Sequence, residues 1–215
     1  MTFHGFVQAG GDSTRFGIDK ALVKLAGKSM LQRTGELLDG VCADVTVVSA
    51  LGRYPDSPWP VLADGWPGEG PLGGILTALN SLHSVTSRHS SAVLENDLCP
   101  FAIIVSCDMP FLTTEFLQFL IARANASEAQ VVVPERVGRL EPMCACWCAA
   151  SLETVRLAFN SGVRKVSEAM KQLPTEVLDE SVWKRFDNHN RLFWNMNTLE
   201  DYETARRILE NGNND

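Results

Sequence analysis

Two short segments combine residue types that bind phosphates with one that binds a divalent cation. Residues 10–20 hold two adjacent glycines, hydroxyl side chains and two basic side chains, Arg15 and Lys20. Glycine lets backbone N–H groups approach phosphate oxygens without a Cβ in the way, and the basic side chains add positive charge. In residues 107–110, Cys-Asp-Met-Pro, the carboxylate of Asp108 follows an apolar run. Together the segments predict a magnesium-assisted site for a nucleoside triphosphate.

Two common phosphate-binding loops do not fit the sequence. A P-loop ending at Gly27-Lys28-Ser29 needs a glycine five residues before Gly27, and that position is Leu22. The dinucleotide fingerprint Gly-x-Gly-x-x-Gly is absent around Gly10. The loop at residues 10–20 is therefore a different kind of phosphate site.

Length, composition and charge limit the class of protein. The chain has 215 residues, of which 45% are hydrophobic, enough for one substantial core and one domain. A formal net charge of −7 argues against a nucleic-acid surface. We find no signal peptide and no membrane-spanning run, and therefore expect a cytoplasmic protein that binds neither nucleic acid nor membrane.

The cysteines and histidines favour structural roles. Cys144, Cys146 and Cys148 alternate, which places their sulfurs on one face of a strand, whereas zinc sites prefer Cys-x-x-Cys. We therefore interpret them as part of a buried strand. The four histidines show neither ligand spacing nor a nucleophile partner.

The pattern of apolar residues predicts an α/β protein. We expect strands at 3–9, 45–49, 61–63, 101–106, 129–133 and 142–149, and helices at 29–38, 75–82, 113–126 and 151–159. Residues 83–100 are polar and rich in serine, and we expect a surface excursion there. The alternation implies three α/β/α layers around a mostly parallel, Rossmann-like sheet.

Three segments are expected to converge at one edge of this sheet. Ligands of open α/β sheets bind beyond the carboxyl ends of the strands, which would bring Gly10, Asp64 and Asp108 together. Residues 70–74, Gly-Pro-Leu-Gly-Gly, fall at a helix N-terminus, where backbone donors gather. By itself, Asp64 is about equally well explained as a strand-end turn former.

Several motifs in chain order resemble those of the molybdenum cofactor guanylyltransferases, within the nucleotidyltransferases of the nucleotide-diphospho-sugar transferase fold. The resemblance covers nearly the whole chain. It depends on residues 9–22 (AGGDSTRFGIDKAL), Asp64, residues 70–75 (GPLGGI) and residues 107–110 (CDMP). Weaker resemblances occur at residues 140–143 (LEPM), 161–164 (SGVR) and 195–198 (NMNT) with 200–201 (ED).

The resemblance implies transfer of GMP from GTP to the terminal phosphate of molybdenum-molybdopterin, which gives the guanine dinucleotide cofactor and pyrophosphate. Residues about 1–112 would bind the nucleotide and residues about 113–215 the acceptor. The implied catalytic residues are Lys20, Arg15 and Asp108, with Mg²⁺ on Asp108 and Asn197 as a second candidate ligand. The implied nucleotide contacts are Gln8, Ala9, Gly10, Gly11, Ser13, Lys20, Asp64, Gly70, Pro71, Leu72 and Asp108, and the acceptor contacts are Arg164, Asn195 and Asn197. Transient partners would deliver molybdopterin and accept the product.

Alternatives remain open at this stage. The family more often carries leucine at the position of Gln8, near where the base is thought to lie, so CTP or another nucleotide is an alternative donor. Another phosphorylated acceptor, or a GTP-binding regulatory module without turnover, is also compatible with the motifs. Asn195 and Asn197 precede a helix that Thr198 could cap, and this structural role is weighed equally with a substrate or metal contact.

Overall fold

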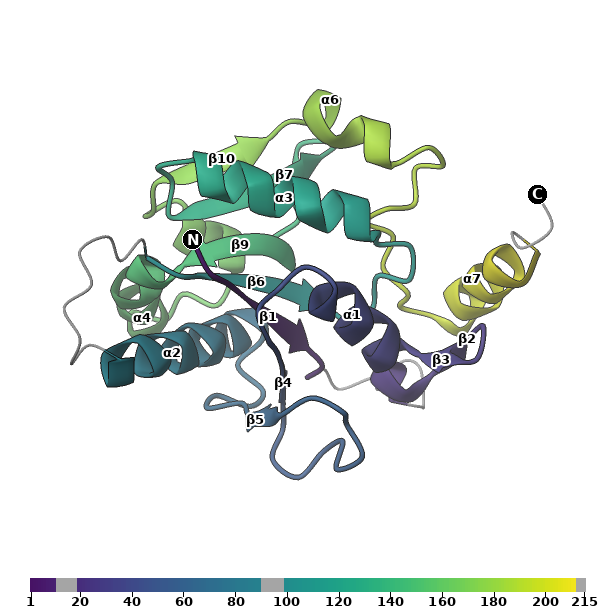
Figure 1. The fold of residues 1–215 in the computed structure, drawn as a ribbon, viewed down its shortest axis with the longest axis horizontal. Helices are drawn as coiled ribbons and strands as arrows, with labels where there is room; N and C mark the ends of the chain where they lie inside the picture. The colour runs from purple at the N-terminus through teal and green to yellow at the C-terminus, as the bar shows by residue number, and fades with distance from the viewer. Residues whose placement is uncertain (11–18, 90–98, 212–215) are drawn as a thin grey trace.

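A mostly parallel sheet forms the centre of the protein (Figure 1). The computed structural model describes residues 1–10, 19–89 and 99–211, and within these ranges eight strands form the sheet. Their order is β10 (Thr175–Leu178), β7 (Val131–Arg136), β9 (Cys144–Cys148), β6 (Phe101–Ser106), β1 (Phe3–Gln8), β4 (Val45–Ser49) and β5 (Val61–Ala63), with β8 (Arg139–Leu140) beside β7. β9 is antiparallel to both neighbours and β8 is antiparallel to β7, while the other pairs are parallel. The predicted α/β class is confirmed.

The central strands β1 and β6 are apolar because helices cover both of their faces. Phe3 pairs with Phe101 and Gln8 with Ser106, so both strands end at the same level. The parallel register therefore places the residues just after Gln8 beside the residues just after Ser106.

Helices form a layer on each side of the sheet (Figure 1). On one face lie α1 (Met30–Asp39) and α3 (Thr114–Ala126), and on the other lie α2 (Pro71–His89), α4 (Leu152–Asn160) and α5 (Val166–Met170). Each layer buries its own apolar core against one face of the strands. The sheet runs without a break from the predicted nucleotide half into the predicted acceptor half through the β6–β9 pair.

The C-terminal helix α7 (Leu199–Asn211) packs outside these layers. Its Ala205 joins a small apolar cluster with Leu25, Met30 and Met196. The antiparallel pair of β2 (Lys24–Leu25) and β3 (Lys28–Ser29) lies next to it (Figure 1). This packing brings the chain before α7 back to the carboxyl edge of the sheet.

Two regions differ from the sequence-based expectation. The predicted surface excursion at 83–100 is wrong over its first part, because α2 continues to His89; no glycine or proline interrupts residues 75–99. Residues 90–98 lie outside the described ranges. Between 160 and 194 the sequence suggested no element, yet α5, β10, α6 (Glu180–Trp183) and the short turn η3 (Lys184–Phe186) form there. These elements are too short to show a clear period.

The alternating cysteines behave as predicted for a buried strand. Cys144, Cys146 and Cys148 lie on one face of β9 and belong to the same apolar core. Burial raises the pKa of the Cys144 and Cys146 thiols, which keeps them protonated at neutral pH.

Candidate active site

The carboxyl ends of the parallel strands bring the predicted site residues to one edge of the sheet. The Cys107 N–H donates to the Gln8 carbonyl at 3.2 Å, so Asp108 lies directly beside the end of β1. At the end of β5, the Asp64 N–H donates to Ser49 O at 2.7 Å. Residues Gly11, Ser13 and Arg15 lie outside the described ranges, and their roles stay predictions.

A cavity of about 240 Å³ opens at this edge. Of the predicted nucleotide contacts and catalytic groups, six line it: Gln8, Ala9, Gly10, Lys20, Pro71 and Asp108. Residues from four separate parts of the sequence therefore meet in one space. Its remaining lining comes from Asp19, Ala21, Ser106, Cys107 and Met143.

Asp108 carries a buried acceptor that needs a ligand. Its Oδ1 atom is enclosed and meets no hydrogen-bond donor among the residues that the structure describes. Burial raises the pKa of Asp108, and a hydrogen bond with Ser106 and the charge of Lys20 partly oppose this rise. A carboxylate oxygen without a partner, in a cavity wall, suits a hard divalent cation that keeps most of its other ligands as water and phosphate oxygens. No group of three acidic, histidine or cysteine ligands occurs among the described residues, so Asp108 alone would fit a Mg²⁺ that depends mainly on substrate and water oxygens.

Lys20 is joined to the C-terminal part of the chain. Its Nζ donates to Asn197 Oδ1 at 2.8 Å, and the Met196 N–H donates to the Asp108 carbonyl at 2.8 Å. Both catalytic candidates are thus tied to the segment just before α7. The Asn197 side chain contacts a predicted catalytic group, although it does not line the cavity.

The helix-cap alternative is also present in this segment. Thr198 Oγ1 accepts from the Asp201 N–H, and Asp201 Oδ2 accepts from the backbone N–H groups of Asn197 and Thr198. This reciprocal arrangement is a capping box for α7. Asn195 makes only a long bond of 3.5 Å from its Nδ2 to Phe193 O among the bonds described.

Gln8 is fixed at the start of α2. Its Nε2 donates to Pro71 O at 3.1 Å, and the side-chain amide lies over Gly74, where a Cβ would come within 2.2 Å of Nε2. Gln8 is only 8% exposed, and its Oε1 meets no donor among the described residues. Gln8 therefore lines the cavity with its carbonyl acceptor enclosed and without a partner among the described residues.

Besides Asn195 and Asn197, four further predicted contacts in the described ranges do not line the cavity. One oxygen of Asp64 accepts from the Trp66 N–H and the Thr77 hydroxyl, as expected of a turn former. Leu72 has no exposed surface and belongs to the core under α2. Gly70 takes φ +80° directly before the helix, and Arg164 pairs with Glu69 and stacks on the Phe159 ring at 4.0 Å.

The sequence of this chain is similar to that of known nucleotidyltransferases. Residues 5–176 match the family described as the MobA-like NTP transferase domain. The chain belongs to this family. It is 28% identical, over 97% of its length and 96% of the relative's, to a "Probable molybdenum cofactor guanylyltransferase" of Chloroflexus aggregans. It is 34% identical, over 76% of each chain, to another of the same description from Mycobacterium bovis (strain BCG / Pasteur 1173P2).

Among solved structures, the fold is similar to that of "Molybdopterin-guanine dinucleotide biosynthesis protein A" from Archaeoglobus fulgidus. The TM-score is 0.77 at 22% sequence identity, and the match covers 96% of this chain and 98% of the other. The agreement in fold extends across the whole MobA-like domain.

Some residues of this MobA-like site were not predicted individually. Ser106 and Met143 line the cavity, and Met143 belongs to the family-like residues 140–143. In the same segment, burial and the Asp108 charge raise the pKa of Glu141, while Arg136 at 3.1 Å opposes this rise. The family-like motif at residues 140–143 indicated that this segment belongs to the site, but it did not indicate that Met143 is the residue that lines the cavity.

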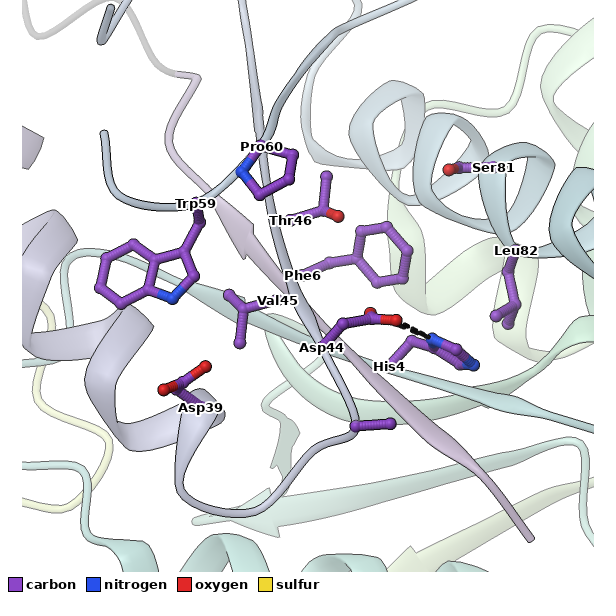
Figure 2. Close-up of a pocket in the computed structure, with 11 residues that line it drawn as sticks. His4, Phe6, Asp39, Asp44, Val45, Thr46, Trp59, Pro60, Ser81 and Leu82 are labelled. Carbon is purple, nitrogen blue, oxygen red and sulfur yellow. Dashed lines mark hydrogen bonds and ion pairs between the residues drawn. The ribbon is translucent and has the colours of Figure 1, made fainter. Parts of the chain in front are cut away.

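A second cavity, of about 460 Å³, lies near the opposite ends of β1 and β4 (Figure 2). Its polar lining includes Asp39 and Asp44, and Asp44 pairs with the ring of His4 at 2.9 Å. Two carboxylates repel phosphate oxygens, so this space does not suit a triphosphate. The smaller cavity, with Lys20, is the better candidate in the MobA-like domain.

No described helix is long and apolar enough to cross a membrane.

Proposed function

We propose that this protein transfers GMP from GTP to the terminal phosphate of molybdenum-molybdopterin. The observation that carries the proposal is the meeting of Lys20 and Asp108 in one cavity beside Gly10, in a chain of the MobA-like family. A cation and a carboxylate that can hold a metal ion are what stabilise the transfer of a charged nucleotidyl group.

The reaction is an in-line substitution at the α-phosphorus of GTP. A terminal oxygen of the acceptor phosphate forms a new P–O bond as the bond between the α-phosphorus and the bridging oxygen to the β-phosphate breaks, and pyrophosphate leaves with that electron pair. The acceptor phosphate is ionised at neutral pH, so no strong general base is needed. The Lys20 ammonium neutralises negative charge that builds up on the phosphate oxygens.

Asp108 and Asn197 are the residues proposed to hold Mg²⁺, with Asp108 as the principal ligand. Bound there, Mg²⁺ would add positive charge to the triphosphate and orient it. Asn197 Oδ1 is engaged by Lys20 in the structure, so its proposed service to the metal requires that hydrogen bond to be exchanged. Arg164 and Asn195 remain candidate acceptor contacts only, because neither lines the cavity.

Gln8 is proposed to contact the nucleobase. Pro71 offers a carbonyl and no N–H, so the hydrogen bond at 3.1 Å orients the Gln8 amide with Nε2 toward Pro71. Oε1 is enclosed without a donor among the described residues. Once uncovered, this acceptor would match the N1–H and N2–H₂ donors of guanine. The leucine that the family more often carries here has no such acceptor.

Magnesium-dependent pyrophosphate release by the purified protein tests the function. Molybdenum-molybdopterin would be supplied with GTP, CTP, ATP, UTP or ITP one at a time, for the wild type and for Gln8→Leu. We expect turnover with GTP, a wild-type preference for GTP over ITP, which lacks the N2 amino group, and a smaller preference in Gln8→Leu. Release with CTP alone would contradict the guanylyl assignment.

If no pyrophosphate is released with molybdenum-molybdopterin and any of these nucleotides, other acceptors and a non-catalytic role are tested next. Release with a different phosphorylated acceptor would keep the nucleotidyl transfer and change the acceptor. GTP binding without pyrophosphate release under any acceptor would favour a regulatory module.

A further inference from the structure

Tyr54 reaches both sides of the glycine-rich segment from the connection between β4 and β5. Its hydroxyl lies 2.9 Å from the Ala9 carbonyl oxygen and 3.1 Å from Asp19 Oδ1. Ala9 precedes residues 10–18 in the sequence and Asp19 comes directly after them. Burial and the charge of Asp19 raise the pKa of Tyr54, so the hydroxyl keeps its proton and can donate. The single hydroxyl proton is therefore shared between the Ala9 main chain and the Asp19 side chain, ten residues apart.

The backbone at Tyr54 adopts a strained, left-handed conformation. Tyr54 has φ +54°, a left-handed conformation that non-glycine residues rarely adopt, and its side chain is only 7% exposed. Strain of this kind persists where the surroundings hold the residue in place. Here the hydroxyl, shared between Ala9 O and Asp19 Oδ1, and the packing of the ring in the core hold the residue.

Both carboxylate oxygens of Asp19 are engaged by neighbours other than Lys20. Its Oδ1 accepts from the Ala21 N–H at 3.1 Å and from Tyr54, and its Oδ2 pairs with the Arg53 guanidinium. Asp19 caps the short turn η1 (Lys20–Leu22), in which Lys20 is the first residue. The Asp19 charge is thus balanced by Arg53, and the adjacent Lys20 points its Nζ to the neutral Asn197 oxygen.

We propose that Tyr54 is a positioning residue for the proposed nucleotidyl transfer, acting through Asp19 to aim Lys20 at the triphosphate. This inference depends on the proposed function for the identity of the triphosphate. Arg53 has a supporting role, because it pairs with the Asp19 carboxylate. Without this pairing, the negative charge of Asp19 would attract the neighbouring Lys20 ammonium and draw it away from the phosphates. Tyr54 and Arg53 touch no substrate in this scheme.

The test compares Tyr54→Phe with Tyr202→Phe. The chain has two tyrosines, and the Tyr202 hydroxyl also donates to a backbone carbonyl, that of Lys24 at 3.4 Å. Both changes remove one hydroxyl and keep the ring. We expect Tyr54→Phe to lower kcat/KM for GTP about 10-fold and to weaken GTP binding, measured by calorimetry with Mg²⁺, about 3-fold. Tyr202→Phe is expected to change neither.

Coupling to Lys20 separates positioning from a general structural role. In the Lys20→Ala background, Tyr54→Phe should have no further effect on kcat/KM or on the dissociation constant of GTP, although it should still lower Tm. The same fold loss in both backgrounds, or wild-type values for Tyr54→Phe, would overturn the inference.

The calorimetric comparison does not need turnover. If the wild type binds GTP and releases no pyrophosphate with any acceptor, the proposed function fails. The GTP affinities of the wild type, the two single variants and the Tyr54→Phe/Lys20→Ala double variant still decide the role of Tyr54. If turnover is observed and the cycle shows independent effects, only the inference about Tyr54 fails.

Discussion

Replacing Asp108 by asparagine is expected to make the metal-free protein more stable while it removes activity. The Asp108 Oδ1 atom is enclosed without a donor among the described residues, and burial raises the pKa of this carboxyl. The folded state therefore favours the neutral acid, and ionisation at neutral pH costs free energy of folding. Asparagine has nearly the same shape and no charge to desolvate.

The size and pH dependence of the effect can be worked out from this geometry. A tenfold rise in the proton affinity of a carboxyl on folding costs about 1.4 kcal/mol at neutral pH, and Asp108→Asn should recover a cost of this order because it removes the charge. In a chain of 215 residues each kcal/mol raises Tm by about 2–4 °C. Because the folded pKa is raised, the wild type loses stability as pH rises from the ordinary value of 3.8 through the folded pKa. The advantage of the variant should be absent below this window and complete above it.

Thermal unfolding in EDTA at a series of pH values measures the effect. Asp64→Asn is the control, because Asp64 accepts hydrogen bonds from Trp66 and Thr77, and its replacement should lower Tm or leave it unchanged. With Mg²⁺ and GTP at about 100 times the dissociation constant, the wild type should gain about 2.7 kcal/mol, and Asp108→Asn much less. A metal-free Asp108→Asn protein that is less stable than the wild type at neutral pH would refute the reasoning.

Three further predictions concern the surroundings of the cavity. Lys20→Ala should lower kcat about 10²–10³-fold with Tm nearly unchanged, and near-wild-type pyrophosphate release would contradict its role. Gly74→Ala should lower the free energy of unfolding by about 1–3 kcal/mol in denaturant, since the new Cβ would lie 2.2 Å from Gln8 Nε2. Adding Gln8→Ala should restore part of that loss by removing this steric overlap. If the losses of the two variants simply add, the overlap is not their cause. Asp201→Ala should cost about 1 kcal/mol because two backbone N–H groups before α7 lose their acceptor, whereas the neighbouring Glu200→Ala should cost little in the same unfolding assay.

The elements nearest the site were predictable from local patterns. The strands at 45–49, 61–63 and 101–106 form over the predicted residues, and Thr113 caps α3 as expected. Runs of apolar residues between breakers predict buried parallel strands, and the ends of such strands share one edge of the sheet. For this reason the meeting of Gly10 and Asp108 could be inferred before any tertiary contact was known.

The tertiary structure alone decided which side chains complete the site. Asn197 meets Lys20 only because α7 packs against the β2–β3 pair, and Tyr54 meets Asp19 only because β4 lies beside β1. These contacts join residues 177 and 35 positions apart, and no local period in the sequence records such distances. In the same way, Arg164 is a plausible phosphate ligand by residue type, but the fold places Glu69 beside it, and the two side chains form an ion pair. The sequence by itself determined the residue types and the strand ends, while the docking of distant segments determined which of those residues act together.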